Sequence, residues 1–66
     1  NAVSDAGVAA LMAHAAAKGA AYNVRINAKD LTDRAVAAAL IEATEDALRV
    51  AAAALEETEH QLKGMI

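Results

Sequence analysis

The sequence predicts an all-α protein, a helical hairpin of two long, alanine-rich helices that forms part of a helical bundle. Apolar residues recur at spacings of three and four, which mark one face of an α-helix. A polar stretch, Ala28–Asp33, divides this pattern into two parts. We therefore expect a helix over about residues 4–27, a turn over 28–32 and a second helix over about 33–63 in a single segment, 1–66.

In the first helix, the larger apolar residues fall on one face, which we interpret as its packing face. Ser4 or Asp5 can begin this helix, because a short side-chain oxygen accepts from the free N–H groups of the first turn. We interpret Gly19 as a point of close contact between helices. Glycine inside a helix costs roughly 1 kcal/mol of helix stability, so we expect close packing to compensate for it. The row comprises Val8, Leu11, Met12, Ala15, Gly19, Tyr22 and Ile26.

The second helix carries an apolar residue every seven positions, which predicts a narrow seam against another helix. Asp30 or Thr32 is the expected N-cap, and Gly64 the C-terminal stop. Glu45 and Arg49 are spaced for an ion pair along the helix. The heptad residues are Ile41, Leu48, Leu55 and Leu62.

Small side chains leave this chain with little apolar volume for a core of its own. It has one Tyr and no Phe, Trp or Cys. A 66-residue chain of this kind needs association to bury its seams. We expect a homo-oligomer, a dimer or higher, or docking on helices from outside this segment.

Charge and composition argue against several classes of function. The net charge of −3 and the scattered basic residues disfavour nucleic-acid binding. Charges interrupt every apolar stretch before about 18 residues, which disfavours a membrane span. No basic region followed by an apolar run opens the chain, so we expect a cytoplasmic protein. His14 and His60 fall on different helices without a ligand cluster, so no metal site is expected.

Two carboxamides, Asn23 and Asn27, lie four residues apart and share one face near the end of the first helix. Asparagine is a poor helix former, so this pair suggests a specific role. Capping or interhelical hydrogen bonding explains it as well as binding a polar ligand does. His14 falls on the row with Lys18 and Arg25, which we interpret as a solvated face, and His60 is expected in solvent.

The motifs resemble a known family. The strings Asn1–Ala6 and Gly19–Asn27, followed by Leu31-x-Asp33, are similar to the C-terminal segment of the formiminotetrahydrofolate cyclodeaminase and methenyltetrahydrofolate cyclohydrolase family. The resemblance covers nearly the whole chain, and the Ser-Asp and Asn-Val-x-Ile-Asn elements are its most specific parts. The family domain is much longer and begins with Gly-rich helices that this sequence does not show.

The resemblance implies an all-α, dimeric, folate-binding domain that acts on the one-carbon unit between N5 and N10 of tetrahydrofolate, without a metal. The resemblance is compatible with two reactions, ring closure of formimino-tetrahydrofolate with loss of ammonia and hydrolysis of methenyl-tetrahydrofolate. The alternative is a self-associating structural helical hairpin, or an inactive fragment, without catalysis of its own. This segment alone would lack half of the site.

Both reactions need acid–base groups and polar groups that orient the substrate. Asp5 is the candidate acid or base. Capping of the helix N-terminus explains its position equally well. Asn23 and Asn27 are candidates for orienting the pterin or the glutamate moiety. Lys18 and Arg25 are candidates for the glutamate tail, against the alternative of solvated charges.

Helix geometry separates these candidates. Asp5 and Asn23 are 18 residues apart, so they share a face but lie about 27 Å from each other. One chain therefore cannot bring both to one reacting carbon. Antiparallel pairing of two first helices would bring Asp5 of one chain near Asn23 or Asn27 of the other, which would place a site between subunits.

Overall fold

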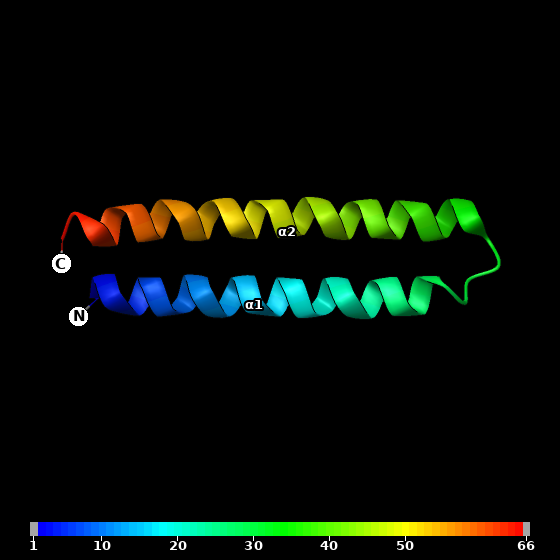
Figure 1. Cartoon of the computed structure of the whole chain (residues 1–66), viewed down its shortest axis with the longest axis horizontal. Helices are drawn as coiled ribbons and strands as arrows, with labels where there is room; N and C mark the ends of the chain where they lie inside the picture. The colour runs from blue at the N-terminus through cyan, green and yellow to red at the C-terminus, as the bar shows by residue number, and fades with distance from the viewer. Residues whose placement is uncertain (1, 66) are drawn as a thin grey trace.

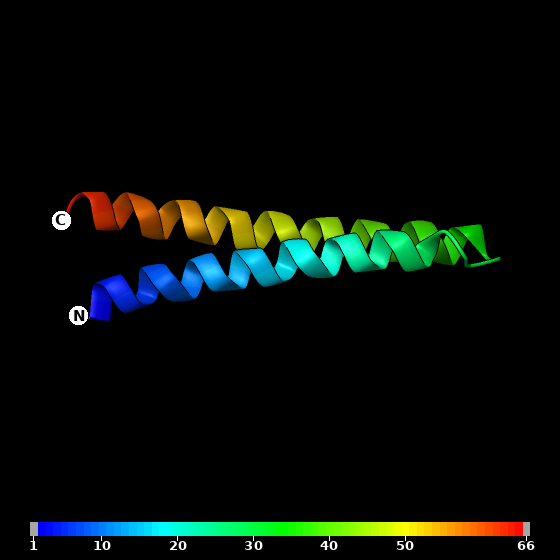
Figure 2. The ribbon, with the colours of Figure 1, turned by 60° about the horizontal axis from the view of Figure 1, so that its bottom comes forward.

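Two long helices form an antiparallel hairpin. The computed structural model describes residues 2–65, in which α1 spans Ala2–Ala28 and α2 spans Arg34–Lys63 (Figure 1). The Cα trace measures 50 × 14 × 12 Å. Turned by 60°, the two ribbons overlap at the connection and separate toward the termini, so the helices cross at a small angle (Figure 2). The predicted helical hairpin is confirmed.

The heptad residues of α2 form the seam that the sequence predicts. Ile41, Leu48, Leu55 and Leu62 are half-buried, and Ala37 is buried with 1% of its surface exposed. Two threonines lie in the same seam, and their hydroxyls donate to backbone carbonyls one turn earlier, Thr44 to Leu40 and Thr58 to Ala54, both at 2.8 Å. These internal bonds satisfy polar groups that would otherwise be costly at a helix interface.

The packing face predicted for α1 is wrong. The larger apolar residues on that helix point away from α2, and Met12 and Tyr22 remain 68% and 58% exposed. Mainly small residues face α2 instead, because alanine lets the two backbones approach closely while the larger side chains come chiefly from α2. The residues of α1 that are buried or half-buried follow heptad spacing: Val3, Gly7, Ala10, His14, Ala17, Ala21, Val24 and Ala28.

Gly7 of α1 and Leu62 of α2 are in close contact. A Cβ placed on Gly7 would lie 2.5 Å from Leu62 Cδ1, so the leucine occupies the space of the missing side chain. Gly19 has no atom within 4 Å of the same position. Gly19 is therefore not a contact point with α2, and its place on α1 needs another explanation.

The helix caps differ in part from the predicted ones. Asp33 is the N-cap of α2, because its Oδ1 accepts from the backbone N–H groups of Ala35 at 3.0 Å and Val36 at 3.1 Å. Asp30 and Thr32 were the wrong candidates, since capping requires an oxygen directly before the first helical residue. Gly64 ends α2 as expected, with its N–H directed to the Gln61 carbonyl.

At the other end of the hairpin, α1 already includes Ala2. Ser4 and Asp5 therefore lie inside the first turns and neither of them is the N-cap that the sequence suggested. Asp5 still places a negative charge near the positive end of the α1 dipole, which favours the helix modestly.

Arg34 closes the connection between the helices. Its Nη1 donates to the carbonyl oxygens of Ala28 and Leu31, both at 2.9 Å, and to that of Lys29 at 3.5 Å. Carbonyls at the end of a helix lack an intrahelical partner, so this guanidinium supplies one to the last residue of α1. Arg34 was not singled out by the sequence pattern.

Candidate functional site

The polar motif residues of α1 lie on the side of the helix that faces away from α2. Asp5, Asn23 and Asn27 are all exposed. Since α1 is one continuous helix from Ala2 to Ala28, Asp5 and Asn23 lie about 27 Å apart along it. A single copy of the chain therefore does not bring the candidate acid–base group and the candidate orienting amides together.

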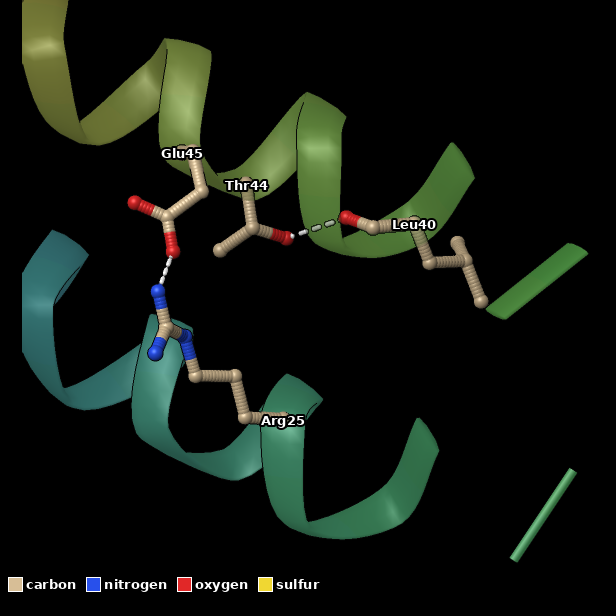
Figure 3. Close-up of polar contacts among 4 residues, drawn as sticks. All are labelled: Arg25, Leu40, Thr44 and Glu45. Atoms are coloured by element: carbon tan, nitrogen blue, oxygen red, sulfur yellow. Dashed lines mark hydrogen bonds and ion pairs between the residues drawn. The ribbon is translucent and has the colours of Figure 1, made fainter. Parts of the chain in front are cut away.

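Lys18 and Arg25 lie on a different side of α1. Arg25 follows Asn23 by two residues, which turns its side chain about 160° around the helix axis. Its guanidinium pairs with the carboxylate of Glu45 on α2 (Figure 3). The five residues predicted as one site are thus divided between two surfaces, and Arg25 is held by a partner within the hairpin.

Glu45 was expected to pair with Arg49 and does not. Arg49 pairs with Asp46 one turn earlier in α2. Glu45 is instead partly covered at the helix–helix boundary, where Arg25 can reach it. A helical-spacing rule finds pairs along one helix, whereas this pair depends on the register between two helices.

A groove of about 530 Å³ lies between His14 of α1 and residues of α2, and we call it the His14 groove. His14 contributes from α1 and is half-buried in the seam, so the solvated position expected for it is wrong. Exposed residues of α2 complete most of the groove, and His60 is exposed as predicted. The other lining residues are Ala52, Ala53, Leu55, Glu56, Glu57, Glu59 and Lys63.

The groove is open and its charged residues are mainly acidic. Within residues 2–65, no three His, Asp or Glu side chains are placed to hold a metal ion. No helix over the described range is long and apolar enough to cross a membrane. A groove of this volume can admit a small molecule, but Glu56, Glu57 and Glu59 would repel an anionic one.

The outward surface of α1 has a different chemical character. Asp5 offers a carboxylate, and the two carboxamides offer both donors and acceptors. Between them lie small and apolar residues, including Met12 and Gly19. Each end of this surface could contribute to a site that positions a polar heterocycle or moves a proton, provided that another element covers that end and supplies the missing groups.

The comparisons with known proteins agree on one relationship. Residues 1–46 match the family model described as formiminotransferase-cyclodeaminase. The whole chain is 42% identical over 66 residues to a methenyltetrahydrofolate cyclohydrolase of Methylorubrum extorquens. That alignment covers 100% of this chain and 32% of the relative, so the chain spans about a third of the length of the curated protein it matches. No solved structure matches.

Proposed function

Because the chain belongs to the formiminotransferase-cyclodeaminase family, we propose that it carries part of a tetrahydrofolate site that hydrolyses the methenyl bridge between N5 and N10. The observation that carries this proposal is the identity to a cyclohydrolase along the whole chain. We expect the reaction to take place in the cytoplasm.

The proposed reaction adds water to the methenyl carbon. The amidinium carbon of the substrate is electrophilic, and Asp5 accepts a proton from the attacking water to give a neutral carbinolamine. The bond from this carbon to N5 then breaks as the hydroxyl proton leaves and N5 is protonated, which yields the 10-formyl product. One proton is released overall, so the carboxylate returns to its starting state.

In this proposal the remaining motif residues bind and orient a substrate whose acid–base group, Asp5, comes from another copy of the chain, because the two ends of one α1 lie about 27 Å apart. Asn23 and Asn27 donate to and accept from the pterin through their carboxamides. Lys18 supplies a positive charge for the glutamate tail, whereas Arg25 must leave Glu45 to take part. Positioning of this kind accounts for much of the rate of such reactions, so a site built from incomplete parts would be slow.

Cyclodeamination is the second candidate, and the description of the matching family model favours it. In that reaction N10 attacks the formimino carbon and ammonia departs. The same acid–base and orienting groups serve, but the leaving nitrogen must be protonated. The two reactions differ in substrate and product, so they can be separated directly.

The test uses the full-length protein and both substrates. Loss of methenyl absorbance reports hydrolysis, and release of ammonia from formimino-tetrahydrofolate reports deamination. We expect hydrolysis, and we expect Asp5→Asn to reduce it strongly while Asp30→Asn, an exposed carboxylate in the connection, leaves it unchanged. A folded protein that acts on neither substrate would instead support the structural helical-hairpin alternative.

A further inference from the structure

We draw no further inference here: the strongest candidate, the His14 groove between α1 and α2, is an open acidic cluster around Glu56, Glu57 and Glu59, and no second feature of residues 2–65 points to a ligand in it.

Discussion

Arg25 of α1 and Glu45 of α2 form an ion pair that joins the two helices at the flank of the hairpin (Figure 3). The Arg25 side chain is 58% exposed and that of Glu45 is 30% exposed, so water and salt screen the attraction. The pair therefore contributes to the alignment of the helices more than to the free energy of unfolding.

We expect Glu45→Gln and Arg25→Gln each to lower the free energy of unfolding by less than about 1 kcal/mol at low salt, and by less still at high salt. Urea denaturation at two salt concentrations measures this. The double variant gives the coupling energy, and Arg49→Gln serves as the control on the outer side of α2. A second use of Arg25 in substrate binding would show as a raised KM in Arg25→Gln that Glu45→Gln does not share.

The half-buried Leu48 should be far less tolerant of charge than its exposed neighbour Val50. Leu48→Asp places a carboxylate in the seam, where it loses water without gaining a partner. We expect a marked loss of helicity in circular dichroism and disruption of assembly in sedimentation. Val50, 71% exposed, provides the matched variant Val50→Asp, which should retain the hairpin. Equal effects of the two changes would contradict the seam.

Removing the Arg34 side chain should weaken the connection. Arg34→Ala removes the side-chain donor from the Ala28 and Leu31 carbonyls. The Ala28 carbonyl still accepts from the Leu31 backbone N–H at 3.2 Å, so we expect a cost of about 1 kcal/mol in the free energy of unfolding. Arg34→Lys keeps the charge but loses the planar fork, so it should recover only part of the stability. Thermal denaturation of the three proteins at one concentration checks this order.

The assignment of Asp33 as the N-cap of α2 predicts different effects for substitutions of Asp33 and Asp30 in the connection. Asp33→Ala removes the oxygen that accepts from Ala35 and Val36 and should cost about 1 kcal/mol. Asp30→Ala should change stability little, because its side chain does not cap α2. A larger effect at Asp30 than at Asp33 would show that the cap is assigned to the wrong residue. Asp33→Asn should be nearly neutral, since asparagine caps almost as well.

Activity should depend on the outward surface of α1, which carries Asp5 and Asn23, more than on the His14 groove. In the full-length protein, the proposed function predicts that Asp5→Asn mainly lowers kcat. It predicts that Asn23→Ala and Asn27→Ala mainly raise KM, with a loss of about 1–3 kcal/mol for each hydrogen bond to bound substrate. His14→Ala and His60→Ala should retain most of the activity. Circular dichroism and the mass in sedimentation, each compared with the wild type, check the folding of every variant. Full activity of Asp5→Asn with loss in His14→Ala would move the site to the groove.

The sequence predicted α2 well because its large apolar residues stand out at heptad positions among charges. It predicted the α1 face poorly for a physical reason. Alanine occurs on every side of α1, so the larger residues such as Met12 and Tyr22 define the visible pattern. Close packing against α2 uses the small residues instead, and the large ones remain for other contacts.

The same distinction applies to the site. The motif around Asn23 and the position of Asp5 could be identified from residue types and spacing alone. The Arg25–Glu45 pair and the half-buried place of His14 could not, because both depend on how α1 and α2 align. The arrangement of the two helices, rather than the pattern along either one, determines which charged side chains already form an ion pair.

The Arg34 contact also bears on how quickly the hairpin folds. Its guanidinium reaches Ala28 across a short connection, so bringing these residues together costs little chain entropy. Most contacts between the helices can then form in sequence from the connection toward the termini, which favours rapid folding. Changes near Arg34 should therefore slow folding, whereas changes at Gly7 and Leu62, at the far end, should mainly accelerate unfolding.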